Sequence, residues 1–162
     1  MSLITCLWFD GRAEEAAEFY TGVLPNSRIT GVTRNTDHAP GETGAVLTVE
    51  FELNGQSFVG LNGGPQFSFS EAVSFQVMCE DQEEVDRYWA TLSEGGEEGP
   101  CGWLKDRYGL SWQVVPTALP RLLNDPDAAR ADRAMTAMMA MGKLDIAGIE
   151  AAADGTDPVP VG

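Results

Sequence analysis

The segment CGWLKDRYGLSWQVVP, residues 101–116, contains most of the residue types that could perform chemistry in this chain. A thiol can act as a nucleophile, an indole ring can form one wall of an organic-ligand pocket, and an amide can orient a bound molecule. Cys101, Trp103 and Gln113 are therefore candidate ligand-binding residues. We interpret the adjacent Lys105 and Asp106 as a turn ion pair or cap rather than a catalytic pair.

Glu50, in the run AVLTVEFEL (45–53), is a candidate general base if its strand face lines a cleft. Apolar and polar residues alternate along this run, so a solvated outer face is the alternative interpretation. The lone histidine, His38, lies in the turn DHAPGETG and is predicted to be solvated. Trp8 and Trp112 are predicted to fill the core, whereas Trp103 is predicted at a pocket mouth.

An internal repeat predicts which elements position these residues. A shift of 69 positions aligns ITCLWFD (4–10) with VSFQVMC (73–79), and EEAAEFYTGVL (14–24) with EEVDRYWATLS (83–93). Each copy reads as an apolar strand followed by a helix with an apolar face. The predicted helix faces are Ala13, Ala16, Ala17 and Tyr20 in the first copy, and Val85, Tyr88, Trp89 and Leu92 in the second.

Further strand-like runs follow each helix, separated by turn residues. They span 28–34, 45–53 and 57–61 in the first copy, and 102–106 and 110–115 in the second, with another expected around 97–100. The sequence thus predicts an α+β fold of two βαβββ modules whose sheets curve around a shared cleft.

The predicted organisation is a single domain over 1–153, with modules at 1–63 and 68–116, C-terminal helices over 117–153 and a mobile tail over 154–162. Asp125 and Pro126 are predicted as the N-cap and first residue of a helix. That helix carries an apolar, methionine-rich surface for packing or for a dimer contact: Ala131, Ala134, Met135, Met138, Met139 and Met141.

Composition and charge exclude several classes of partner. The formal net charge of −15 leaves no basic stripe for nucleic acid and disfavours anionic membranes. No run approaches the ~20 apolar residues of a membrane span. The N-terminus shows no secretory pattern, and the three cysteines form no CxxC motif, so we expect reduced thiols and a cytoplasmic location.

The segments FDGRAEEAAEFYTGVLPNSRI, FVGLNGGPQFSFSEAVSF and CGWLKDRYGLSWQVVP resemble the vicinal-oxygen-chelate superfamily, which includes glyoxalase, bleomycin-resistance and extradiol-dioxygenase proteins. They are similar to its PhnB-like branch, often named demethylubiquinone methyltransferase. The resemblance covers residues 1 to about 150. It implies paired βαβββ modules in an incomplete barrel, and a homodimer.

Metal-dependent members of the superfamily use His, Glu or Gln on the first and last strands of each module. Gln113, four residues after Gly109, matches a last-strand position, and Val59 or Asn62 stands at its counterpart. The first-strand candidates are Thr5, Cys6, Ser74 and Phe75. This is a poor ligand set for a divalent metal. We therefore expect Gln113 to face the cleft without a catalytic metal, and no cofactor is predicted.

Three functional hypotheses remain open from the sequence. The first is a protein that binds a small organic molecule in an aromatic cleft, using Gln113, Trp103, Asn62, Cys101 and Glu50. The second is a lyase, isomerase or dioxygenase-type enzyme acting on a small oxygenated metabolite. The third is a dimeric interaction module.

The glycine clusters LNGGP and GGEEGPCG do not lie at the start of a helix that follows a strand, so methyl transfer is not assigned.

Overall fold

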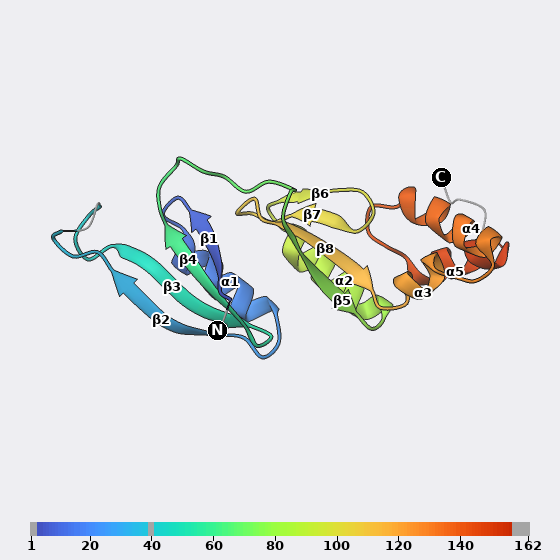
Figure 1. The fold of residues 1–162 in the computed structure, drawn as a ribbon, viewed down its shortest axis with the longest axis horizontal. Helices are drawn as coiled ribbons and strands as arrows, with labels where there is room; N and C mark the ends of the chain where they lie inside the picture. The colour runs from blue at the N-terminus through green and yellow to red at the C-terminus, as the bar shows by residue number, and fades with distance from the viewer. Residues whose placement is uncertain (1–2, 39–40, 157–162) are drawn as a thin grey trace. The chain divides into compact units, whose positions relative to one another are not determined.

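The chain forms two compact units in the computed structural model, Met1–Phe69 and Ser70–Gly162. The structure describes residues 3–38 and 41–156. Each unit contains one four-stranded sheet with a helix on one face (Figure 1). Of the predicted tail, residues 157–162 lie outside the described part of the chain.

The first unit has the element order strand, helix, three strands. Its sheet order is β1-β4-β3-β2, with β1 parallel to β4 and the other pairs antiparallel. A two-residue turn, Asn54-Gly55, joins β3 to β4, and both residues have positive φ as such hairpin turns require. The elements are β1 (Thr5–Phe9), α1 (Ala13–Val23), β2 (Arg28–Arg34), β3 (Val46–Leu53) and β4 (Gln56–Asn62).

The second unit repeats this order. Its sheet order is β5-β8-β7-β6, again with the first strand parallel to the last. The short strand expected around 97–100 is present at 97–98. The elements are β5 (Ser74–Cys79), α2 (Gln82–Ser93), β6 (Glu97–Glu98), β7 (Trp103–Lys105) and β8 (Ser111–Pro116). The predicted α+β fold of two βαβββ modules is therefore confirmed.

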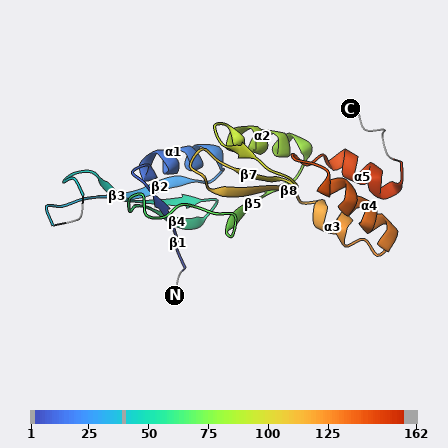
Figure 2. The same ribbon diagram turned by 90° about the horizontal axis from the view of Figure 1, so that it is seen from above.

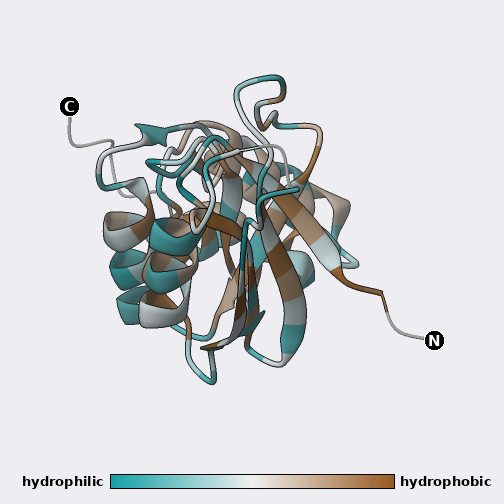
Figure 3. Cartoon of the chain, turned by 90° about the vertical axis from the view of Figure 1, so that its left-hand side faces the viewer, coloured by the Kyte–Doolittle hydropathy of each residue, from teal (hydrophilic) through white to brown (hydrophobic). Residues whose placement is uncertain are grey.

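The apolar helix faces predicted from the 3.6-residue period are also confirmed. All four predicted residues of α1 and all four of α2 are buried. Along β3, Val49, Phe51 and Leu53 are buried while Glu50 is exposed, and Figure 3 shows the bands of opposite hydropathy that this alternation produces along strands. Each sheet therefore has one face packed on a helix and one face without a helix.

The gapless 69-position repeat is wrong in detail. In the strand register Cys6 lies opposite Val59, and Gln76 lies opposite Gln113, so the first strands correspond after 70 positions. The buried helix residues correspond after 72, since Ala13 matches Val85. Strand side chains alternate between faces, so a one-residue slip assigns every residue to the wrong side.

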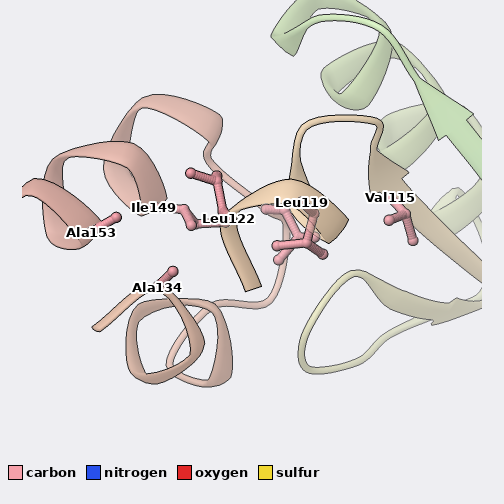
Figure 4. Packing of buried hydrophobic residues seen from close by; sticks show 7 residues of the cluster. Val115, Leu119, Leu122, Ala134, Ile149 and Ala153 are labelled. Carbon is pink, nitrogen blue, oxygen red and sulfur yellow. The ribbon is translucent and has the colours of Figure 1, made fainter. Parts of the chain in front are cut away.

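The C-terminal segment is helical, as predicted, and forms α3 (Leu119–Leu123), α4 (Ala128–Met139) and α5 (Ile146–Asp154). The three helices group at one end of the second unit (Figure 2). They share a core with the last residues of β8 (Figure 4): Val115, Leu119, Leu122, Ala134, Leu144, Ile149 and Ala153.

Two predictions about α4 change with the structure. Asp127, not Asp125, is the N-cap, and its carboxylate accepts from the backbone N–H groups of Ala129 and Arg130. Asp125 instead accepts hydrogen bonds from the Asp127 N–H and from Arg130, and these bonds lower the pKa of the Asp125 carboxyl.

The methionine-rich surface consists of a packed part and an exposed part. Met138 and Met141 pack on the helical core, whereas Met135 and Met139 are exposed. No helix in the described residues is long and apolar enough to cross a membrane.

Candidate functional site: a pocket on the open face of the second sheet

The face of the second sheet that lacks a helix presents two rows of side chains. Strand register places the rows side by side across β5, β8 and β7. One row is Gln76, Gln113 and Trp103, and the next is Ser74, Ser111 and Lys105. Residues from 74 to 113 are thus brought together by strand pairing alone.

Gln113 is held by hydrogen bonds to the first strand of its unit. Its Nε2 donates to Ser74 Oγ at 2.8 Å, and its Oε1 accepts from Gln76 Nε2 at 3.1 Å. Sequence reasoning named Gln113 but missed Gln76, because the 69-position repeat aligned Phe75 with Cys6. Counting four residues from Gly55 and Gly109 reaches Val59 and Gln113 on the last strands, but only the strand register identifies Gln76.

A pocket of about 400 Å³ opens beside these rows and lies wholly within the second unit. This volume falls in the range typical of small-molecule sites, roughly 300–1,000 Å³. Trp103 lines it, together with residues of β6, β7, β8 and the loop between β6 and β7. The full lining is Glu71, Glu97, Glu98, Gly99, Pro100, Trp103, Leu104, Lys105 and Ser111.

Ser111 is the unusual member of this lining. The residue is fully buried, yet its Oγ has no hydrogen-bond partner among the described residues. A buried hydroxyl without a partner costs about 1–3 kcal/mol, so such groups are rare in folded proteins. Ser111 thus lines the pocket and carries a hydrogen-bonding group that no described residue uses.

Lys105 lies opposite Ser111 in the strand register and forms an ion pair with Glu71. The Nζ to Oε1 distance is 2.6 Å. The hydrogen bond from Lys105 lowers the pKa of the Glu71 carboxyl, and the same bond raises the pKa of Lys105. Of the two structural roles predicted for Lys105 and Asp106, an ion pair or a cap, the structure shows the cap, because Lys105 pairs with Glu71 and Asp106 caps the turn.

Asp106 is a turn cap, which is one of the two roles that the sequence predicts for it. It is 3% exposed, and its Oδ1 accepts from the backbone N–H groups of Tyr108 and Leu110. Its Oδ2 accepts from Trp112 Nε1 at 2.8 Å, and Trp112 lies in the core, as predicted. Asp106 therefore fixes the hairpin that places Lys105 and Ser111 opposite each other.

The connection between α4 and α5 holds the loop that forms one wall of the pocket. The Cys101 N–H donates to the Met141 carbonyl and the Gly102 N–H to the Gly142 carbonyl, both at 2.7 Å. Gly102 has a φ of 81°, and a Cβ there would lie 2.7 Å from the Val114 carbonyl oxygen. The Cys101 thiol contacts the Met139 sulfur at 3.6 Å, and its predicted ligand-binding role stays a prediction.

In the first unit, Glu50 is exposed on the face without a helix, opposite Val59. Asn62 has a structural role: its Oδ1 accepts from the Ala13 N–H at the start of α1, and its Nδ2 donates to the Val46 carbonyl. Ligand binding by Glu50 and Asn62 stays a prediction.

The core placement predicted for Trp8 is wrong. Its ring lies on the face of the first sheet without a helix, in edge contact with Phe67, and its Nε1 donates to the Gly64 carbonyl. A Cβ on Gly63 would lie 2.2 Å from the ring, so only glycine fits there. The one-residue error of the 69-position repeat is not the cause of this wrong prediction. Instead, the connector after β4 folds back and half-buries an outward-facing residue.

His38 is exposed in its turn, as predicted. Among residues 3–38 and 41–156, no three His, Cys, Asp or Glu side chains group closely enough to hold a metal ion.

Comparison with known proteins places this architecture in a family. The model of the 3-demethylubiquinone-9 3-methyltransferase family matches residues 1–115. The chain belongs to this family. Its PhnB-like members fall within the vicinal-oxygen-chelate superfamily that the sequence motifs resemble. The match ends within β8, so α3, α4 and α5 lie beyond the family model.

Solved structures agree with this assignment. A PhnB protein from Bacillus cereus that carries the same family name is 35% identical, with a TM-score of 0.65, and the match covers 72% of this chain and 100% of that one. A protein from Pseudomonas aeruginosa matches at 16% identity and a TM-score of 0.60, over 72% of this chain and 97% of that one.

The fosfomycin resistance protein FosX from Listeria monocytogenes matches at 13% identity and a TM-score of 0.50, over 74% of this chain and 95% of that one. At these low identities the last two matches show the fold alone. None of the curated proteins matches the chain.

The family name implies a methyl donor, which the residues present do not fit. A nucleotide-type donor site uses a glycine-rich turn from a strand into a helix. Here Gly63 and Gly64 follow β4 and enter the connector, while Gly95 and Gly96 follow α2 and lead into β6. The three strand-to-helix turns of the described residues, at 10–12, 80–81 and 117–118, contain a single glycine, Gly11. No methyl-transfer step follows from these residues.

Proposed function

We propose that this family member binds a small organic molecule, without a catalytic metal, in the pocket on the open face of its second sheet. The observation that carries the proposal is the fully buried Ser111, whose Oγ has no partner in the described structure and which lines a pocket of about 400 Å³. An apolar wall with a few polar groups is the usual composition of such sites.

Trp103 supplies the apolar wall, and Leu104 lies beside it. Lys105, Glu97 and Glu71 supply charge, and Ser111 supplies a hydroxyl. The adjoining Gln76–Gln113 pair adds amide groups in the same row as Trp103. This arrangement favours binding over nucleophilic catalysis, because the Cys101 thiol contacts Met139 and the described part of the second unit contains no histidine to act as a base.

A fragment screen by ligand-observed NMR tests the proposal. We expect fragments to bind the untagged protein and to lose about fivefold in affinity in Trp103→Ala, because an aromatic wall contributes about 1 kcal/mol. Phe67→Ala is the matched control, since it removes an exposed ring from the first unit. Equal effects of the two variants, or stoichiometric metal by elemental analysis of protein purified without chelator, would contradict the proposal.

We also propose that the chain is a homodimer, as the sequence resemblance implies. Exposed apolar side chains on α4, Met135 and Met139, support an additional contact surface. Light scattering coupled to gel filtration at several concentrations tests this, and a constant monomer mass would overturn it. The cytoplasmic location stays a prediction.

A further inference from the structure

The pocket of the second unit carries an excess of negative charge. Its lining contains three glutamates and one lysine, a formal charge of −2. Lys105 is already paired with Glu71, so it does not offer a free cation to an anionic ligand. An anion entering this pocket would meet a lining with a net negative charge.

The three carboxylates are not equivalent. Glu71 accepts from Lys105, and Glu98 accepts from Trp89 Nε1 at 2.9 Å. Glu97 forms no ion pair or side-chain hydrogen bond with any residue in the described part of the chain. Glu97 lies opposite Lys105 in the register of β6 and β7, on the face without a helix. It is therefore the carboxylate available to a ligand.

Glu97 and Ser111 mark the two ends of one row. Lys105 stands between them, with Glu97 on one neighbouring strand and Ser111 on the other. Strands are about 4.8 Å apart, so the two ends are separated by roughly 10 Å at the backbone. A single small group cannot contact both, but a molecule with polar groups at its two ends can.

Trp103 provides the surface between those ends. Its ring lines the pocket in the row next to Lys105, and an indole face attracts an organic cation as well as an apolar body. We propose that the ligand is an organic ammonium ion that carries a hydroxyl or carbonyl oxygen at its other end, with an apolar or aromatic spacer between them. The ammonium donates to Glu97, the spacer lies on Trp103, and the oxygen hydrogen-bonds Ser111 Oγ. This inference rests on the binding function proposed above.

Four probes of one shape separate the contributions of the two ends. Tyramine has both an ammonium and a hydroxyl, phenethylamine has only the ammonium, 4-ethylphenol has only the hydroxyl, and 4-hydroxyphenylacetate carries an anion in place of the ammonium. Affinities are measured by calorimetry or ligand-observed NMR at low salt. We expect tyramine to bind at least about tenfold more tightly than 4-ethylphenol, since one charge pair at short range supplies that difference.

Variants assign each end of the ligand to its residue. Glu97→Gln is expected to weaken both amines about tenfold and to leave 4-ethylphenol unchanged. Ser111→Ala is expected to weaken tyramine and 4-ethylphenol but not phenethylamine. Glu18→Gln, an exposed position on α1 of the other unit, is the matched control for charge. Melting temperatures of all variants show whether each remains folded.

The outcomes distinguish this inference from the function on which it rests. If 4-ethylphenol or 4-hydroxyphenylacetate binds as tightly as tyramine, with binding still lost in Trp103→Ala, the pocket is a ligand site but the ammonium inference is overturned. An equal loss for amines in Glu97→Gln and Glu18→Gln also overturns it. If none of the four probes binds folded wild-type protein, the inference is overturned, and the fragment screen decides separately on the binding function.

Discussion

The two sheets share one topology but use their open faces differently. Strand register makes Ser57 the counterpart of Ser111, and Glu52 the counterpart of Lys105. Glu52 lies beside Arg28, and the two form an ion pair at 2.8 Å within the first sheet. In the second sheet the signs are reversed, and Lys105 pairs with Glu71 before β5 rather than with its strand neighbour Glu97.

A second difference lies in the length of the outer strands. In the first unit β2 and β3 have seven and eight residues, whereas β6 and β7 have two and three. The shorter strands leave a loop at 99–102, and that loop with β6 and β7 lines the pocket. The two units thus share helix-packed faces, which the core requires, whereas their open faces differ.

The hairpin turns give the largest expected difference between the sheets. Asp106→Ala should destabilise the second unit by about 4 kcal/mol, because it leaves buried donors of Trp112 and the turn backbone without a partner. Asn54→Ala in the first hairpin should cost only about 1 kcal/mol, from its positive φ. Urea unfolding measures both, and equal costs would show that the two turns are equivalent.

The C-terminal helices of the second unit give the next largest expected effect. Leu144 is fully buried in the C-terminal core and lies close to Gly102. Leu144→Ala should cost about 3 kcal/mol by cavity formation. It should also accelerate hydrogen exchange at residues 99–105 while leaving the 53–56 turn unchanged. If hydrogen-exchange rates at 99–105 are the same in Leu144→Ala as in the wild type, the C-terminal core does not hold this wall of the pocket.

The paired serines provide a smaller and more specific comparison. Ser111→Ala in the ligand-free protein should stabilise it by about 1 kcal/mol, because it removes a buried hydroxyl that has no partner in the described structure. Ser57→Ala, at the half-buried counterpart, should change stability little. Destabilisation by Ser111→Ala would indicate that a partner already satisfies its hydroxyl.

The Glu71–Lys105 pair gives the smallest effect. The pKa of Glu71 is lowered in the folded chain, so its contribution to stability is present at neutral pH and is lost as the pH falls through the folded-state pKa. Glu71→Gln should therefore flatten the acid side of the pH–stability profile slightly. Glu52→Gln, at the ion pair of the first sheet, is the matched variant. A steeper profile in Glu71→Gln would contradict the assignment.

Much of the fold could be predicted because it depends on local periodicity. The buried faces of α1 and α2, the alternation along β3 and the βαβββ order all follow from residues close together in sequence. Trp103 was also predicted at a pocket mouth, and it lines the pocket. The predictions are wrong where the face that a residue occupies depends on the pairing of its strand with another strand. Alignment of the repeat by residue similarity alone predicts Phe75 as the counterpart of Cys6, whereas the strand register makes Gln76 that counterpart.

The sequence by itself determined the family, the two modules and the position of each helix face, because these follow from motif and period. Only the tertiary structure showed that Ser111 Oγ has no hydrogen-bond partner among the described residues, that Lys105 pairs with Glu71, and that the connection between α4 and α5 holds the loop at 101–102. Each of these depends on how segments distant in the chain pack together. Local sequence specifies which side chains are buried, but the packing of distant segments decides which polar groups remain free to bind a ligand.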